Sequence, residues 1–114
     1  MLSHQRHILK RLIFLRGQKA DVYRDIKNEF GEPAGWDFYG TIRGIFHEAN
    51  GYLGSLIAEA GTTYTSKQPM FLIEHTKAVR EEDTLHIGER KFRVTGVDDL
   101  GNLGMFLDLS LEVI

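Results

Sequence analysis

The chain contains no cysteine and only two prolines in 114 residues. Without cysteine it has no thiolate nucleophile, no disulfide framework and no sulfur-ligated zinc site. Hydrophobic residues make up 42% of the sequence, which is enough to build a core without such cross-links. The length suits one domain and leaves no room for a second core. We therefore predict a single domain, residues 1–114, that folds in a reducing compartment.

A surplus of positive charge is also missing, because 14 Lys and Arg residues face 16 Asp and Glu residues, for a formal net charge of −2. A dedicated DNA-binding protein normally carries a concentrated basic surplus, since phosphate neutralisation supplies most of its affinity. No apolar run approaches the roughly 20 residues that cross a bilayer. The apolar run at residues 12–15 is too short for a signal peptide. The sequence predicts a soluble protein that is made inside the cell and has no membrane partner.

The last third of the chain, residues 82–114, has the alternating pattern of β-strands. Successive side chains of a strand point to opposite sides of a sheet, so a strand with one buried face has apolar residues at every second position. In the final segment Leu107 and Leu109 are expected on the buried face and Asp108 on the polar face. Three short strands are predicted, at residues 84–87, 91–95 and 105–113.

The first residues predict a short amphipathic helix. Ser3 is a suitable N-cap, apolar residues recur at helical spacing over residues 4–16, and Gly17 ends the pattern. A strand at Leu12 to Leu15 is the alternative interpretation of the same apolar run.

Two strands are predicted in the first half of the chain, on either side of a strong turn signal at residues 31–35. Gly40 and Gly44 both fall in the second of them, where glycine indicates a sharp bend, a bulge or the close approach of another backbone. The two predicted strands cover residues 19–29 and 38–48.

The segment from Asn50 to Thr63 breaks this pattern and is expected to be a long connection between strands. It is either a short helix or a mobile loop. Strand character resumes over residues 64–76, where Pro69 favours an edge position or a strand start, and a charged linker follows at 77–83. The order predicts a mainly β fold: a small β-barrel or sandwich over residues 18–114, with a short N-terminal α-helix within residues 1–17 and a long inter-strand loop.

No residue pattern predicts a catalytic, cofactor-binding or metal site. His4 and His7 have the i, i+3 spacing of metal ligands on a helix, but no third ligand lies near them in sequence, so they are interpreted as part of a basic, solvated face. His47 is followed by Glu48 but lacks the second histidine of a zinc-protease helix. His75 and His86 are interpreted as surface histidines. We predict no enzyme activity, no cofactor and no metal.

The sequence pattern of residues 83–99, DTLHIGERKFRVTGVDD, combines a strand, a glycine turn, basic residues, an aromatic residue and a second strand before the final hairpin. Together with the interrupted middle of the chain, it resembles the small head-completion proteins of tailed bacteriophages and prophages. These are also called head-closure, head–tail connector or stopper proteins. The resemblance extends from about Lys19 to Ile114.

This resemblance implies a non-enzymatic virion protein, made in the host cytoplasm and located at the head–tail interface. Such proteins form rings, often dodecameric, below the portal and its adaptor, dock the tail and in some members close the channel to retain packaged DNA. Because contacts that are weak singly add up around a ring, the isolated subunit is expected to be monomeric at low concentration. The resemblance places a candidate channel or gating loop at Asn50, Gly51, Tyr52, Gly54, Ser55, Glu59, Gly61 and Thr63.

A ring also requires surfaces through which copies of the subunit meet, and apolar helix faces and terminal strands are natural candidates. The mild negative charge suits a channel wall past which genomic DNA slides without sequence-specific binding. The predicted partners are further copies, portal and adaptor proteins, and tail proteins. The candidate subunit-interface residues are Leu12, Ile13, Leu15, Leu109, Leu111 and Val113.

Three other functions are compatible with the same sequence. A tail-terminator or tail-completion protein would use similar strands. A small enzyme or ligand-binding barrel would need His47, His75 and His86 to cluster with carboxylates. A nucleic-acid-binding module would use the basic residues of the N-terminal helix, which are Arg6, Lys10, Arg11 and Arg16.

Overall fold

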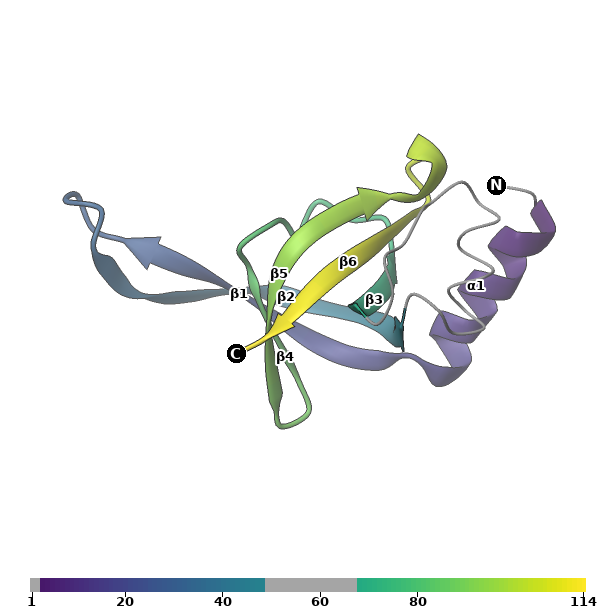
Figure 1. The fold of residues 1–114 in the computed structure, drawn as a ribbon, viewed down its shortest axis with the longest axis horizontal. Coiled ribbons are helices and arrows are strands. Elements are labelled where there is room, and N and C mark those ends of the chain that lie inside the picture. The colour runs from purple at the N-terminus through teal and green to yellow at the C-terminus, as the bar shows by residue number, and fades with distance from the viewer. Residues whose placement is uncertain (1–2, 49–67) are drawn as a thin grey trace.

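The computed structural model describes residues 3–48 and 68–114. Within them, six antiparallel strands close into a barrel in the order β1-β2-β3-β6-β5-β4, and one helix packs against its outside (Figure 1). This confirms the predicted mainly β fold class and the predicted order of one helix, two strands and four further strands. The elements are α1 (Ser3–Arg16), β1 (Gln18–Lys27), β2 (Pro33–Glu48), β3 (Pro69–Glu74), β4 (Thr84–Ile87), β5 (Arg90–Asp99), a short 3-10 turn (Leu100–Asn102) and β6 (Phe106–Val113).

The turn between β1 and β2 lies earlier than the predicted position at residues 31–35. The side-chain Oδ1 of Asn28 accepts hydrogen bonds from the backbone N–H groups of Phe30 and Glu32, each at 2.9 Å. The backbone N–H of Asn28 in turn donates to the carbonyl of Glu32 at 2.9 Å. Because asparagine closes the turn with its own side chain, β2 begins at Pro33 rather than at residue 38.

Two other boundaries also differ from the sequence-based expectation. Leu12 to Leu15 lie within α1, so the alternative strand there is wrong. β5 continues to Asp99 instead of ending at residue 95, because Val97 to Asp99 remain paired with β6 beyond a bulge. Pro69 is the first residue of β3, as its missing N–H group predicts.

The inside of the barrel is the main hydrophobic core. Its members alternate along each strand, so the period-two pattern of the last three strands is confirmed for the interior face. Val79, from the segment predicted to be a linker, is buried among them. The buried members are Ala20, Val22, Phe71, Ile73, Val79, Leu85, Ile87, Phe92, Val94, Leu107, Leu109 and Leu111.

A second apolar cluster lies on the outside of the barrel, under α1. Leu9 and Ile13 of the helix pack there with Leu72 of β3 and Phe106 of β6. As a result β3 is buried on both faces, and its four central residues, Met70 to Ile73, are each at most 3% exposed. A strand covered on both faces reads as a continuous apolar run, which explains why β3 lacks alternation.

The carboxyl end of α1 is fixed to β2 by Arg43. Its Nε donates to the carbonyl of Ile13 at 3.1 Å and its Nη2 to the carbonyl of Phe14 at 3.4 Å. The N–H of Gly17 also donates to the carbonyl of Ile13, at 3.0 Å. The last carbonyls of a helix lack intrahelical partners and attract a cation, so Arg43 both caps and anchors α1.

Both glycines that the sequence singled out in β2 have the predicted roles. At Gly40 the register with β1 shifts, because Tyr39 is an extra residue between the pairs that Val22 and Tyr23 form. At Gly44 an added Cβ would lie 2.6 Å from the carbonyl oxygen of Leu72, closer than real Cβ atoms come. One glycine therefore permits a bulge and the other permits close packing of β2 on β3.

The hairpin formed by β1 and β2 extends well beyond the barrel. β1 pairs with β4 only through residues 21–23, and β2 pairs with β3 only through residues 44–48. The rest of the hairpin, residues 25–38, is here called the arm. The arm points along the longest axis of the molecule, whose extents are 48 × 27 × 26 Å, and α1 lies at the opposite end (Figure 1).

Candidate functional site: the projecting arm

The arm exposes large hydrophobic side chains that a folded subunit normally buries. Phe30 at its tip is 77% exposed, and Trp36 and Phe38 on β2 are 60% and 59% exposed. None of the three belongs to either hydrophobic core cluster. Large exposed apolar side chains gathered on one projection are typical of surfaces that bind another macromolecule.

One face of the arm continues into an aromatic cluster at its base. The ring of Tyr23 lies 5.5 Å from that of Phe38, 6.3 Å from that of Trp36 and 4.4 Å from the imidazole of His86, measured between centroids. The Nζ of Lys91 lies 5.6 Å from the centre of the Trp36 ring. Side chains from β1, β2, β4 and β5 thus hold the aromatic face in a fixed orientation.

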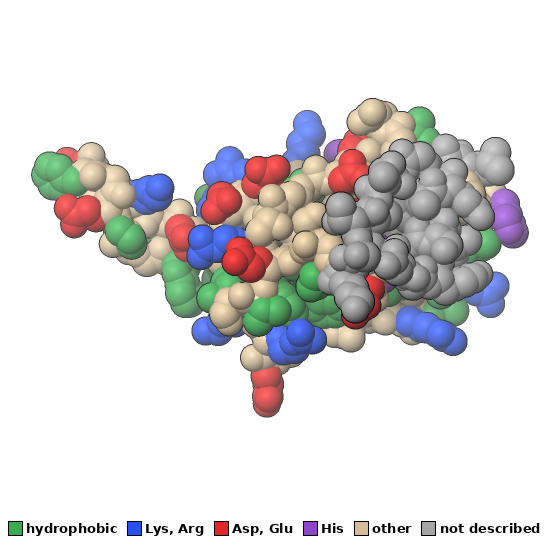
Figure 2. Space-filling model, viewed as in Figure 1, with side chains coloured by type: hydrophobic (Ala, Val, Ile, Leu, Met, Phe, Trp, Pro, Cys, Tyr) green, Lys and Arg blue, Asp and Glu red, His purple; other side chains and the backbone are tan. Residues whose placement is uncertain are grey.

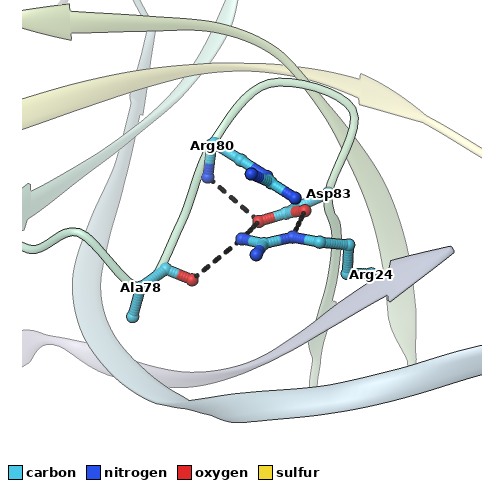
Figure 3. A network of polar contacts seen from close by, with 4 residues as sticks. All are labelled: Arg24, Ala78, Arg80 and Asp83. Atoms are coloured by element: carbon cyan, nitrogen blue, oxygen red, sulfur yellow. Dashed lines mark hydrogen bonds and ion pairs between the residues drawn. The ribbon is translucent and has the colours of Figure 1, made fainter. Parts of the chain in front are cut away.

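On the opposite face, an ion pair anchors the arm to the barrel (Figure 3). The guanidinium of Arg24 donates to both oxygens of the Asp83 carboxylate, with Nε to Oδ1 and Nη2 to Oδ2 each 2.8 Å apart. Asp83 also accepts the backbone N–H of Arg80 at 2.9 Å. Asp83 is only 1% exposed and Arg24 17%, so the pair is shielded from water. The bidentate geometry restricts how the arm can leave the barrel.

The electrostatics of this anchor follow from the same contacts. The hydrogen bond to Asp83 raises the pKa of Arg24 above its ordinary value, against the opposing effect of burial. The ring of Tyr39 lies 4.0 Å from the guanidinium carbon and adds a cation–π contact. Arg24 is therefore a permanent cation that holds β1, the bulge of β2 and the segment before β4 together.

The sequence offered no signal that Arg24 and Asp83 form a pair. Arg24 and Asp83 are 59 positions apart, and Asp83 stood in an acidic run that was interpreted as a linker. The only local clue is that Asp83 directly precedes a strand, where a carboxylate can accept backbone N–H groups.

A second buried polar pair lies on the outside of the barrel. Nε2 of His47 is 2.9 Å from Oδ1 of Asp108, with the two side chains 4% and 0% exposed. Asp108 lies on the outward face of β6, as the alternation predicts, but the expectation that only one face of this strand is buried is wrong at this position. The outward face of β6 is covered there, as it is at Phe106 under α1, and a buried carboxylate requires a hydrogen-bonding partner.

The three histidines required by an enzyme or ligand-binding site are not brought together. His47 pairs with Asp108, His86 packs against Tyr23, and His75 follows β3, which is not adjacent to β4 in the barrel. Within residues 3–48 and 68–114, no group of three His, Asp or Glu side chains could hold a metal ion. The described part of the chain also has no helix long and apolar enough to cross a membrane.

The predicted subunit-interface residues fall into two groups. Ile13, Leu109 and Leu111 are at most 4% exposed, so they contribute to the fold of one subunit. Leu12 is partly buried against the cluster under α1. Leu15 and Val113, at 60% and 61% exposed, are available to a partner.

The predicted gating loop lies outside the described residues. This applies to all of its candidates, which are Asn50, Gly51, Tyr52, Gly54, Ser55, Glu59, Gly61 and Thr63.

A hollow of about 340 Å³ lies beside the carboxyl end of α1. Ile13 and Phe14 of the helix form one wall, and Ile42 and Arg43 of β2 form another. Phe14 itself is 77% exposed. The end of the molecule opposite the arm thus offers an open recess with apolar walls.

Comparison with known proteins supports the fold. No protein-family model and no curated protein sequence matches the chain. Among solved structures, it resembles a chain of the "Virion of native gene transfer agent (GTA) particle", with a TM-score of 0.52 and 14% sequence identity. The match covers 87% of this chain and 94% of that chain. At this identity the likeness shows a shared fold.

Proposed function

We propose that this protein is a structural component of a phage-like virion, a connector subunit that joins the head to the tail. The observation that carries the proposal is the match to a chain of a gene transfer agent virion over nearly the full length of both chains. The resemblance of residues 83–99 to head-completion proteins, which lies in the sequence alone, supports the same class of protein. The exposed aromatic arm is what an assembly subunit requires and a soluble enzyme does not.

The physical properties of the subunit suit a ring below the portal and its adaptor. A ring forms when two different surfaces of one subunit meet on successive copies, and contacts that are weak singly add up around the closed circle. The closed barrel supplies a rigid body, and the arm supplies a surface that reaches beyond it. A net charge of −2 suits a wall along which DNA must slide without being held.

In this proposal the segment from Asn50 to Thr63 lines or closes the channel. It is inserted between β2 and β3, and it is rich in glycine, with Gly51, Gly54 and Gly61. Long insertions in small domains commonly carry function. Deletion of the segment tests whether these residues help to retain DNA.

The decisive experiment removes the gene from an element that produces particles and examines the lysate by electron microscopy. We expect DNA-filled heads without tails, or heads that have lost their DNA, together with free tails of normal length. Complementation with the intact gene should restore whole particles. Complementation with a variant that lacks residues 51–61 should restore joining but not DNA retention. Normal particles in the deletion strain would refute the proposal.

A tail-terminator or tail-completion protein is the second candidate, because the matching chain belongs to a whole virion and its description does not give a position in the particle. The same micrographs separate the two roles. A tail-side protein should leave tails of abnormal length or shape, whereas a connector should leave both heads and tails intact but apart.

A further inference from the structure

The arm is strongly acidic. Its fourteen residues, 25–38, contain four carboxylates and one lysine. Two of the carboxylates, Glu29 and Glu32, flank the exposed Phe30 at the tip and are themselves exposed. Figure 2 shows hydrophobic and acidic side chains at the tip of the arm. The tip is therefore an apolar knob surrounded by negative charge.

The opposite end of the molecule has the complementary character. α1 carries Arg6, Lys10, Arg11 and Arg16, all exposed, and no acidic residue. In Figure 2, Lys and Arg side chains project at this end. The hollow beside the helix has mainly apolar walls with Arg43 among them, and Glu74 is the one carboxylate in its lining. This end therefore combines a recess with mainly apolar walls and a helix whose charged side chains are all basic.

These two surfaces cannot meet within one subunit. They lie at opposite ends of a molecule 48 Å long, and the arm is held away from the helix by the anchor of Arg24 and Asp83 (Figure 1). If the two surfaces bind each other, they must therefore belong to different copies of the chain. Complementary charge of this kind selects partners and fixes their orientation.

We propose that the arm of one copy docks against α1 of a second copy, with Phe30 seated in the hollow beside the helix and the carboxylates of the arm facing its basic residues. The inference rests on the proposed function, since it names the contact through which the ring is built. The contact is heterologous, so it leaves a free arm at one end and a free helix at the other, and successive copies can extend or close the assembly.

This contact assigns a role to features that the barrel does not need. Phe14 and Leu15 of α1, at 77% and 60% exposed, would be covered by the incoming arm. The basic residues of α1 would bind a neighbouring protein instead of DNA, which agrees with the absence of a global basic surplus.

Charge reversal tests the contact with two variants. One reverses the arm, with Glu29→Lys and Glu32→Lys, and the other reverses the helix, with Lys10→Glu and Arg11→Glu. Sedimentation velocity at low salt should show association of the wild type and at least roughly tenfold weaker association of each variant alone. An equimolar mixture of the two variants should associate again, because each positive surface then finds a negative one. The matched control for the arm variant, Glu81→Lys with Glu89→Lys, changes the net charge by the same amount as the arm reversal, at exposed positions outside the arm and α1, and should associate like the wild type.

Disulfide trapping locates the contact in a chain that has no cysteine of its own. Phe30→Cys mixed with Phe14→Cys should give a mixed disulfide at about 1 mM protein, the order of effective concentration within an assembly. A disulfide requires Cα atoms within about 7 Å, so this pair reports docking of the tip beside α1. Phe30→Cys mixed with Glu89→Cys is the control and should give little product.

Several results would overturn the inference: association that neither reversal weakens, a mixture that does not recover, no mixed disulfide at this concentration, or arm–arm disulfides in excess. The last would indicate a symmetric dimer. Docking of the arm on a portal, adaptor or tail protein in place of a second copy would also overturn it.

If these tests fail while the deletion strain still yields heads and tails apart, the connector function stands without this contact. If they succeed while the deletion strain makes normal particles, the contact stands without the connector function.

Discussion

β1 and β2 contribute to both the barrel and the arm, and their hydrophobic side chains differ in burial between these two regions. Ala20 and Val22 of β1 are fully buried, whereas Phe30, Trp36 and Phe38, a few residues further along the hairpin, are more than half exposed. The change occurs at the bulge of β2 and at the anchor of Arg24 with Asp83. A hydrophobic side chain on the barrel side of that boundary is buried in the core of the subunit, whereas beyond the boundary it is largely exposed, and we propose that it serves contacts with other molecules.

The largest expected effect contrasts one phenylalanine from each region. Phe71→Ala, in the interior of the barrel, should lower the free energy of unfolding by about 4 kcal/mol, because it removes a fully buried ring and leaves a cavity. Phe30→Ala, at the tip of the arm, should change it by less than about 0.5 kcal/mol. Urea unfolding followed by circular dichroism measures both. A loss of similar size in the two variants would remove the distinction between barrel and arm.

The boundary itself can be broken at Arg24. Arg24→Leu leaves the buried Asp83 carboxylate without its cation and should cost about 3 kcal/mol. The double variant Arg24→Leu, Asp83→Leu removes the unpaired charge and should recover most of that loss. Urea unfolding of the three proteins provides the comparison. A double variant less stable than Arg24→Leu would show that the pair acts through something other than mutual charge compensation.

Close packing on the barrel side can be tested at Gly44. Gly44→Ala places a methyl group 2.6 Å from the carbonyl oxygen of Leu72, so we expect a loss of about 2 kcal/mol from displaced backbone. The control is Gly96→Ala, where the nearest atom, Oγ of Ser110, would lie at 3.4 Å. Thermal unfolding should show a clearly lower midpoint for the first variant and little change for the second. Equal midpoints would contradict the close approach of β2 and β3.

The smallest effect is expected from pH, because the contribution of Arg24 to the free energy of unfolding should not change near neutral pH. The pKa of Arg24 is raised in the folded protein, so its stabilising contribution is fully present below the pKa of arginine in the unfolded chain and is lost only as the pH rises through the folded value. The difference in unfolding free energy between the wild type and Arg24→Leu should therefore stay constant from about pH 7 to about pH 9. A difference that shrinks within this window would mean that another titrating group supplies the stabilisation.

The sequence was informative wherever structure follows from local pattern. The helix, the alternation of Leu107, Leu109 and Leu111 and the two special glycines of β2 all depend on spacing that can be read directly. The arm could not be recognised in this way. Trp36 and Phe38 alternate with polar residues just as buried strand residues do, and only the pairing of distant strands shows that the barrel ends before them.

The site residues were harder to predict for the same reason. Arg24 meets Asp83, and His47 meets Asp108, across 59 and 61 positions of sequence. The period-two pattern placed Asp108 on the polar face of β6 correctly, but it carried no information about what covers that face. Burial of a polar residue depends on tertiary packing, which a local pattern does not contain.

A cryo-electron microscopy reconstruction of particles from an element that carries this gene tests the central claim most directly. The account predicts a ring of copies between head and tail, each barrel fitting the density and each arm lying against α1 of its neighbour. Finding the protein elsewhere in the particle, or absent from it, would contradict the account.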